Sequence, residues 1–218
     1  VTFFFAYMPP KLSVIIPVYH EESTIQSCMH HIQDSVAYEI IVVDAIGTTL
    51  KHVPNTCVKL KSKKKGRAYQ MNLGAKHAKA PYLLFLHADT HLPKKALSKI
   101  INLLNKKANI TAGAFDLQFD DLKYYPLGWL ASLRSRITRI PYGDQAIFIR
   151  KEIFNQIEGF ADVPILEDVR LMETLKKKKQ SIYIFSKSVK TSTRRWKKEG
   201  FLKQTLKNRL IMYRYKRA

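Results

Sequence analysis

The sequence has few cysteines and no long apolar run. Cys28 and Cys57 are too few for a disulfide framework, and they lack the spacing of a CxxC or Cys/His metal site. No apolar run approaches the roughly 18 to 20 residues that a membrane-spanning helix needs. Residues 1–8 are too short for a signal peptide and have no basic start. We therefore expect a protein of a reducing compartment, the cytoplasm.

Acidic residues are also scarce. The chain has 17 Asp and Glu against 38 Lys and Arg, which leaves a formal net charge of +21. Such an excess favours an anionic partner, which could be nucleic acid, the phosphates of a nucleotide or an anionic membrane surface. The charge alone does not separate these, because lysine runs such as residues 61–65 and 176–179 also occur on ordinary solvated loops and helix ends.

Apolar runs alternate with helical patterns along the 218 residues. Short buried strands are predicted over residues 12–17, 39–44 and 82–86, and helices are predicted after an N-cap at Ser23, over 66–79 and over 97–104. This alternation predicts an α/β fold with mainly parallel strands. Further strands over residues 110–119, 145–150 and 181–185 make the second half a mixed sheet, and residues 120–141 are left as a loop.

The C-terminal residues form a separate pattern. Residues 1–198 are expected to form one domain, and residues 199–218 a basic amphipathic tail. The tail's apolar residues fall on one helical face, namely Phe201, Leu202, Leu206, Leu210 and Tyr213. This face could lie on an anionic bilayer or pack on the chain's own domain, and both interpretations stay open.

Polar residues stand where two of the predicted strands end. Asp44 closes the second strand, and His87 and Asp89 follow the third. Ligands of open α/β sheets bind beyond the carboxyl ends of the strands. An Asp with a neighbouring His can hold a divalent metal that bridges two phosphates, although a turn or a helix cap is the commoner role for any one of these residues alone.

Five segments in order carry a family resemblance: SVIIPVYHEE, EIIVVD, LLFLHADTHLP, YGDQAIFIRKEIFNQIEGF and LEDV. Over residues 12–196 the chain resembles the family 2 glycosyltransferases. It is most similar to a bacterial subgroup with HADT and YGDQ that is often labelled as arsenosugar-biosynthesis glycosyltransferases. The resemblance implies a GT-A-like (Rossmann-like) fold, with a mixed, mainly parallel sheet flanked by helices.

The resemblance also implies a set of residues that bind the nucleotide sugar. Asp44 matches the acid that contacts the nucleobase, and the segment GRAYQMNLG lies beside the nucleotide. Asp144 and Gln145 lie near the sugar or acceptor, and the guanidinium groups and ring of residues 194–196 suit phosphates and stacking. The full set is Pro17, Glu21, Asp44, Gly66, Arg67, Gln70, Asn72, Asp144, Gln145, Arg194, Arg195 and Trp196.

A metal and a base are implied as well. Asp89 matches the last Asp of the DxD-type metal motif, and His87 stands where that motif has its first carboxylate. A divalent Mg²⁺ or Mn²⁺ would stabilise the diphosphate leaving group. Asp168, with Glu167 beside it, matches the Glu-Asp pair and would take the acceptor's proton in an inverting displacement.

These acids and the YGDQ turn also have simpler interpretations. As an alternative to catalysis, Glu167 and Asp168 complement the dipole of the helix that they begin. As an alternative to a site role, Gly143 supplies the backbone freedom of a turn. The chain departs from the family at His20, where Asn is common, and over residues 44–49, which lack the usual Gly-Ser-x-Asp continuation.

The expected function is therefore sugar transfer from a nucleotide-diphosphate donor to a hydroxyl acceptor, either lipid-linked or a small molecule. Peripheral contact with an anionic membrane is compatible with the charge. A basic nucleic-acid-binding protein is the alternative, and it ranks lower because the basic runs are dispersed and no recognition helix is evident. An inactive, membrane-associated relative is a third possibility.

Overall fold

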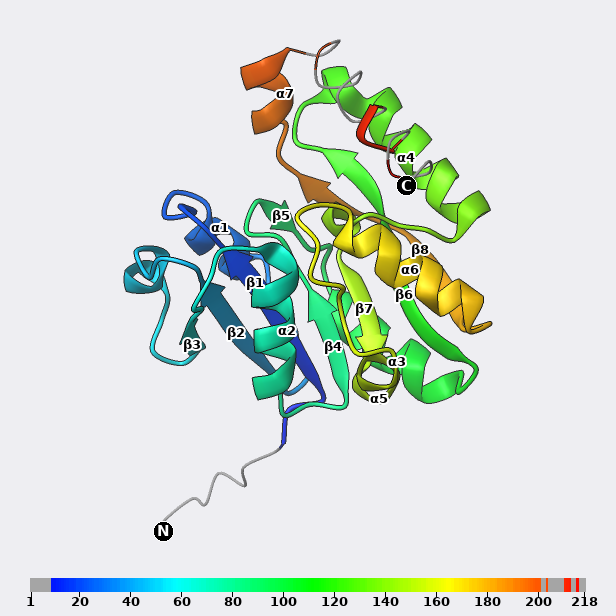
Figure 1. The fold of residues 1–218 in the computed structure, drawn as a ribbon, viewed down its shortest axis with the longest axis horizontal. Coiled ribbons are helices and arrows are strands. Elements are labelled where there is room, and N and C mark those ends of the chain that lie inside the picture. Colours follow the sequence, from blue (N-terminus) through cyan, green and yellow to red (C-terminus); the bar gives the residue numbers. More distant parts are fainter. Residues whose placement is uncertain (1–8, 201–202, 204–209, 213–214, 216–218) are drawn as a thin grey trace.

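A sheet of eight strands forms the centre of the molecule, in the order β3-β2-β1-β4-β7-β6-β8-β5 (Figure 1). This computed structural model describes residues 9–200, 203, 210–212 and 215. The strands are β1 (Leu12–Val18), β2 (Tyr38–Asp44), β3 (Val58–Lys61), β4 (Tyr82–Phe85), β5 (Thr90–His91), β6 (Ile110–Phe119), β7 (Ile147–Arg150) and β8 (Ser181–Thr191).

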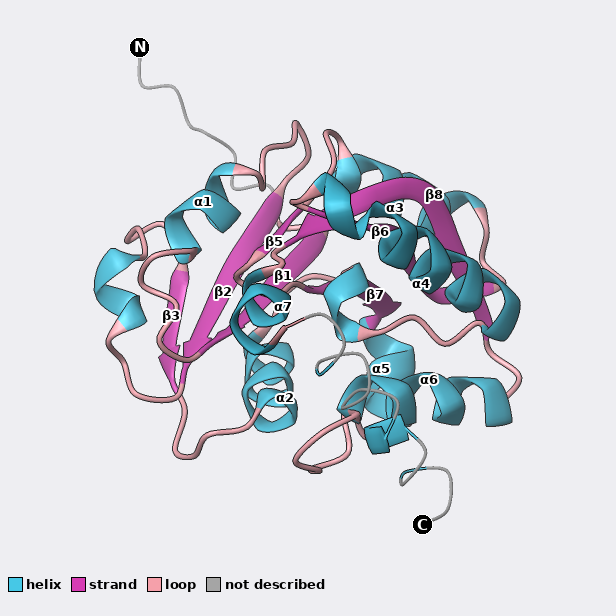
Figure 2. Cartoon of the chain, turned by 90° about the horizontal axis from the view of Figure 1, so that it is seen from above, coloured by secondary structure: helices cyan, strands magenta, loops and turns pink. Residues whose placement is uncertain are grey.

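Helices cover both faces of the sheet (Figure 2). They are α1 (Ile25–His30), α2 (Arg67–His77), α3 (Ala96–Lys106), α4 (Tyr125–Thr138), α5 (Lys151–Gln156), α6 (Glu167–Lys177) and α7 (Arg194–Glu199), with the 3-10 turns η1 (Thr49–His52), η2 (Leu122–Tyr124) and η3 (Gly143–Gln145). One apolar cluster packs α1, α3 and α4 on the sheet, and the other packs α2, α5 and α6 on the opposite face. None of the helices in the described ranges is long and apolar enough to cross a bilayer.

The first half of the sheet is parallel. β1 pairs with β2 and with β4, and β2 pairs with β3, all in parallel. All seven residues of β1 are buried, as expected for a strand covered on both faces. Gly74 brings α2 close to this strand, because a Cβ on Gly74 would lie 2.5 Å from Cγ2 of Ile15. The carboxyl ends of β1, β2 and β4 therefore lie along one edge.

The second half of the sheet is mixed. β7 runs antiparallel between β4 and β6, β6 pairs in parallel with β8, and the short β5 pairs antiparallel with β8. The predicted α/β class with a mixed, mainly parallel sheet is confirmed. The pairing of β5 with β8 brings the loop after β4 next to the start of α7, although a hundred residues of chain separate them.

Several local predictions were wrong. The N-cap of α1 is Thr24 and not Ser23, and the Thr24 hydroxyl donates to the Glu21 carboxylate and makes no cap hydrogen bond. Strands β3 and β5 are too short and too polar to give a periodic signal, and the expected loop over 120–141 contains α4. The predicted boundary at residue 198 stays a prediction. Phe201, Leu202, Leu206 and Tyr213 of the expected tail lie outside the described residues, whereas Leu210 is described and half exposed.

We predict that Gly113→Ala destabilises the sheet. A Cβ at this position of β6 would overlap the Tyr183 carbonyl oxygen and Cζ of Phe148. Because the strands cannot separate locally, the free energy of unfolding in urea should fall by about 2 kcal/mol or more. The control Ser186→Ala, on an exposed part of β8, should stay within about 0.5 kcal/mol of the wild type. Equal stability of both variants would contradict this packing.

Candidate functional site

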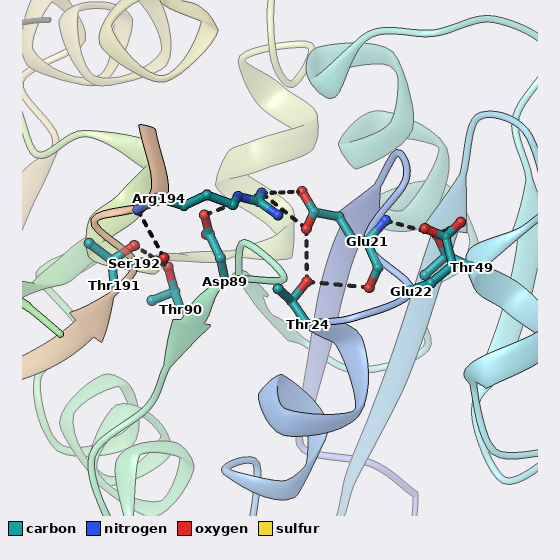
Figure 3. Close-up of polar contacts among 9 residues, drawn as sticks. All are labelled: Glu21, Glu22, Thr24, Thr49, Asp89, Thr90, Thr191, Ser192 and Arg194. Carbon is teal, nitrogen blue, oxygen red and sulfur yellow. Dashed lines mark hydrogen bonds and ion pairs between the residues drawn. The ribbon is translucent and has the colours of Figure 1, made fainter. Parts of the chain in front are cut away.

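An ion-pair network joins three segments at the carboxyl edge of the sheet (Figure 3). Arg194 Nη2 donates to Oε1 and Oε2 of Glu21 at 2.9 and 3.2 Å, and it lies 4.0 Å from Oδ2 of Asp89. Thr24 Oγ1 donates to Glu21 Oε2 at 2.8 Å and orients that carboxylate. The guanidinium of α7 thus lies against the loops that follow β1 and β4.

The backbone at the start of α7 is held by a second acid. Thr193 donates to Asp120 Oδ1 through its backbone N–H at 2.9 Å and its hydroxyl at 2.7 Å. The indole ring of Trp196 packs on Phe119 and Tyr124, with centroids 6.0 and 6.2 Å apart. Of the three residues predicted to contact phosphates or a base, Arg194 therefore faces the site and Trp196 supports α7; the side chain of Arg195 lies outside what is described.

Asp44 is fully buried beneath its own loop. Its carboxylate accepts the backbone N–H of Ile46 at 2.9 Å and of Thr49 at 2.8 Å. Thr49 Oγ1 in turn accepts the N–H of Glu21 at 3.2 Å. The loop that lacks the second acid of the family is therefore ordered by threonine hydroxyls and by Asp44 itself, and it is tied to the loop after β1.

The predicted residues of α2 mostly hold backbone. Gln70 is buried, and its Nε2 donates to the carbonyls of Val18 at 2.8 Å and Val43 at 2.7 Å, which bridges the ends of β1 and β2. Pro17 lies one residue before the end of β1, in register with Val43.

The flanks of α2 have different roles. The Asn72 amide exchanges two hydrogen bonds with the backbone of Phe160, at 2.8 and 2.9 Å. Gly66 has φ of 149°, which favours glycine, and it is the N-cap of α2. The next residue, Arg67, pairs through Nε with Glu167 Oε1 at 3.0 Å.

The predicted Glu-Asp pair begins α6 beside the YGDQ turn. Asp168 Oδ2 accepts the N–H of Gly143 at 2.5 Å, and its Oδ1 accepts the N–H of Val169 at 2.8 Å. Glu167 is buried; burial raises its pKa, and the Arg67 guanidinium opposes that rise. One acid is therefore oriented by backbone amides and the other by an arginine.

Gly143 lies in a tight place between two side chains. Its φ is not positive, so the alternative interpretation, in which it supplies the backbone freedom of a turn, was wrong. A Cβ on Gly143 would lie 3.0 Å from Nε2 of His87 and 3.4 Å from Oδ2 of Asp168. The YGDQ turn, the loop after β4 and the start of α6 thus meet at this glycine, and both the His87 ring and the Asp168 carboxylate lie beside it.

Asp144 is a buried carboxyl group whose pKa is clearly raised. Its Oδ1 is buried and makes no hydrogen bond. Burial, and then the nearby Asp168 and Asp89 carboxylates, raise the pKa of Asp144 to about 6, against the opposing charges of Arg134 and Arg67. The carboxylates of three segments therefore repel one another at this point of the sheet edge.

This carboxylate group fits a cation only in part. No cluster of three or more His, Cys, Asp or Glu side chains that could hold a metal ion occurs among the described residues. The unpartnered Asp144 oxygen and the mutual repulsion nevertheless suit a divalent ion that brings further oxygen ligands with it, such as phosphate oxygens and water.

Sequence reasoning missed Arg134 and Tyr142. The Arg134 guanidinium lies 3.3 Å from the centroid of the Tyr142 ring, and Nη2 donates to Gln145 Oε1 at 3.4 Å. Gln145 itself is buried and donates to the Phe115 carbonyl at 2.9 Å, so it anchors the turn. Two sequence signals could have placed α4: the apolar residues spaced by four at positions 125, 129, 133 and 137, and the small residues at 128, 132 and 135.

Comparison with known proteins gives a match to one family model and a similarity of fold to solved structures. Residues 13–161 match the family model described as Glycosyl transferase family 2. No curated protein matches the chain. The fold is similar to that of the mannosyltransferase PcManGT from Pyrobaculum calidifontis, solved in complex with GDP-Man and Mn2+, at 18% identity and a TM-score of 0.64 over 84% of this chain and 57% of that one.

The fold is also similar to that of TarS from S. aureus. The structure of its residues 1–349 in complex with UDP-GlcNAc gives a TM-score of 0.68 at 18% identity, over 84% of this chain and 58% of that one. The chain therefore spans less than two thirds of either solved structure. At this identity the likeness shows the fold.

We predict that Gln70→Met destabilises the protein. The variant fills similar space but leaves the carbonyls of Val18 and Val43 without their donor in a buried place. The free energy of unfolding should fall by about 2 kcal/mol or more. Gln156→Met, on the exposed side of α5, is the control and should change it little. A stable Gln70 variant would contradict the bridging role.

We also predict that the stability gained by Asp144→Asn depends on pH. Because the pKa of Asp144 is raised to about 6 from 3.8, ionised Asp144 disfavours the folded state, and the protein loses stability as pH rises from about 4 through 6. In EDTA at pH 7.5 the variant should be more stable by on the order of 3 kcal/mol. Thermal unfolding should show the gain disappear near pH 4. Asp162→Asn, at an exposed acid, should show no such dependence, and a pH-independent gain at Asp144 would contradict the assignment.

Proposed function

The chain belongs to glycosyl transferase family 2, and we propose that it transfers a sugar from a nucleotide-diphosphate donor to a hydroxyl acceptor with inversion. The observation that carries this proposal is the convergence of Asp168, Asp144 and His87 around Gly143 at the carboxyl edge of the sheet. A base, a cation site and a place for phosphates are the groups that this reaction needs, and they lie together there.

The donor would lie along the ends of β1 and β2. GDP-Man and UDP-GlcNAc are bound by PcManGT and TarS, which share the fold, and this supports a nucleotide sugar here. Asp44 would receive the nucleobase after a small movement of the loop that now covers it. Arg194 would pair with the diphosphate. Its guanidinium lies near Asp89, the proposed metal ligand, and already pairs with the two carboxylate oxygens of Glu21.

A divalent metal, Mg²⁺ or Mn²⁺, would be held by Asp89, with His87 beside it and the donor phosphates as further ligands. When bound, it would neutralise the negative charge that develops on the diphosphate leaving group. The chain itself would contribute the negative charges of Asp89 and Asp144, which attract the cation. Mn2+ accompanies GDP-Man in the PcManGT structure, which supports this cofactor.

Asp168 would take the proton of the attacking hydroxyl. Its two oxygens are oriented by the N–H groups of Gly143 and Val169, so each can still receive a proton through a free lone pair. Glu167, paired with Arg67, would keep the first turn of α6 in place. A direct displacement with Asp168 as general base inverts the anomeric carbon.

The finer assignments follow the same resemblance. The HADT and YGDQ segments support the bacterial arsenosugar-type subgroup. The excess of positive charge supports an acceptor with an anionic group, including a lipid-linked one at a membrane surface.

We predict that Asp168→Asn separates turnover from donor binding. In a screen of UDP-, GDP- and dTDP-sugars with and without Mn²⁺, the wild type should show thermal stabilisation and turnover with at least one donor. Asp168→Asn should keep the stabilisation and lose about 10²-fold or more in kcat, because only the base is removed.

Two further variants complete this test. Asp89→Asn should lose the part of the thermal shift that requires Mn²⁺, whereas Glu152→Gln, at an exposed acid on α5, should behave as the wild type. Turnover by Asp168→Asn at the wild-type rate would overturn the base assignment. A wild type that responds to no donor would overturn the proposed activity.

A further inference from the structure

Helix α4 carries its large apolar side chains on the outside. The residues that it buries are small, namely Gly128, Ser132 and Ser135. Its solvent-facing side consists of Tyr125, Trp129, Leu130, Leu133 and Ile137, which are 57, 55, 52, 39 and 74% exposed. A surface helix normally has the opposite arrangement, so this face calls for a partner.

The orientation of α4 is fixed by contacts on its inner side. A Cβ on Gly128 would lie 2.8 Å from the Leu117 carbonyl oxygen, so the helix lies directly on β6. Ser132 Oγ accepts the Leu117 N–H at 2.8 Å, and Ser135 Oγ donates to Gln145 Oε1 at 2.6 Å. Large residues do not fit this side, so α4 cannot turn its apolar face inward.

The outward face is a continuous stripe. Tyr125, Trp129, Leu133 and Ile137 follow one another at intervals of four residues, which places them in line over about 18 Å of helix. Leu122, in the turn before α4, is 79% exposed and extends the stripe. In Figure 1 this helix lies at the rim of the molecule, beyond β6.

The charges around the stripe are basic. Helix α4 contains no acidic residue, and the exposed Lys123 and Arg139 stand at its two ends. The nearest acids are already paired: Asp116 with Arg136 at 2.7 Å and Asp121 with Lys197 at 3.2 Å. An apolar stripe with basic ends suits a surface that is apolar inside and anionic at its boundary.

We propose that α4 docks on the surface of a membrane that contains anionic lipids. Trp129 and Tyr125 would lie at the headgroup level and the aliphatic side chains below it, while Lys123 and Arg139 would pair with lipid phosphates. A second copy of the chain fits less well, because pairing along α4 would bring together two molecules of net charge +21.

The described part of the C-terminal segment makes its contact elsewhere. Tyr215 donates its hydroxyl to Glu173 Oε2 at 2.6 Å, and Glu173 belongs to α6. Helix α6 also contacts the last residue of α4, since Lys176 Nζ donates to the Thr138 carbonyl at 2.8 Å. The contact of Tyr215 is therefore made to α6 and not to a residue of the stripe.

Docking through α4 would orient the acceptor side of the site. Ser135 and Arg134 both contact Gln145, so the helix and the YGDQ turn move as one unit. If the proposed sugar transfer holds, the acceptor is then a hydroxyl of a lipid-linked molecule that reaches Asp168 from the bilayer. The docking itself does not depend on that activity.

The test is co-sedimentation with vesicles, without donor or acceptor. The vesicles are phosphatidylcholine, either pure or with about one third phosphatidylglycerol. The full chain should sediment with the anionic vesicles, more weakly with neutral ones, and the fluorescence of Trp129 should shift to the blue. The variant with Trp129→Ser, Leu133→Ser and Ile137→Ser should bind about tenfold more weakly or worse, because three apolar side chains no longer enter the bilayer.

The control is Val58→Ser, which removes a partly exposed apolar side chain of β3 and should bind as the wild type. The triple variant should keep the wild type's circular dichroism and its thermal shift with donor, which separates loss of docking from loss of folding or of donor binding. The proposal is overturned if the wild type stays in the supernatant or if the triple variant binds equally well. A wild-type dimer that the triple variant abolishes, with no vesicle binding, would assign the stripe to a second copy instead.

Discussion

The hydrogen bond from the Gly143 N–H to Asp168 is the contact on which the acidic part of the candidate site is built. It joins the turn before β7 to the first residues of α6, and the His87 ring fills the remaining space beside the glycine. With no side chain at residue 143, these three segments approach closely enough for their acids to act on one another. This contact holds the Asp168 carboxylate close to Asp144, whose pKa is raised first by burial and then by the charge of Asp168.

The electrostatics follow from an acidic centre in a basic molecule. The net charge of +21 attracts anions over a long range, whereas Asp89, Asp144 and Asp168 repel them close to the reacting atoms. Arg67 and Arg194 each pair with a glutamate at the boundary between the two regions. A ligand that combines phosphates with a cation satisfies both regions at once, and neither phosphates nor a cation alone does so.

Sequence reasoning placed the strands with the strongest apolar pattern and the motifs at their ends. The run before Pro17 and the run before His87 are buried strands because β-branched and aromatic residues are continuous there. It could not place β5, whose two residues depend on pairing with Thr191 and Lys190 of β8, a hundred residues away. It also missed α4, because a helix with Gly128 and Ser132 inside and Trp129 outside has the reverse of the usual pattern.

The candidate site, like the fold, was predictable from the sequence only in part. The motifs identified acids that converge, but they did not distinguish Arg194, which faces the site, from Gln70 and Asn72, whose amides bind backbone. Side-chain amides serve either purpose with the same sequence signature. Only the positions of Val18, Val43 and Phe160 decide between the two uses.

The salt bridge between Glu21 and Arg194 crosses the boundary of the region shared with the family, since Glu21 lies within residues 13–161 and Arg194 lies beyond them. Asp168 also lies beyond that boundary. The common region thus holds the ends of β1 and β2 and the YGDQ turn, and the rest of the chain contributes Asp168 and Arg194. A piece of the chain cut at residue 161 would therefore keep the strand ends but lose the guanidinium that pairs with Glu21 and the carboxylate that accepts the Gly143 N–H.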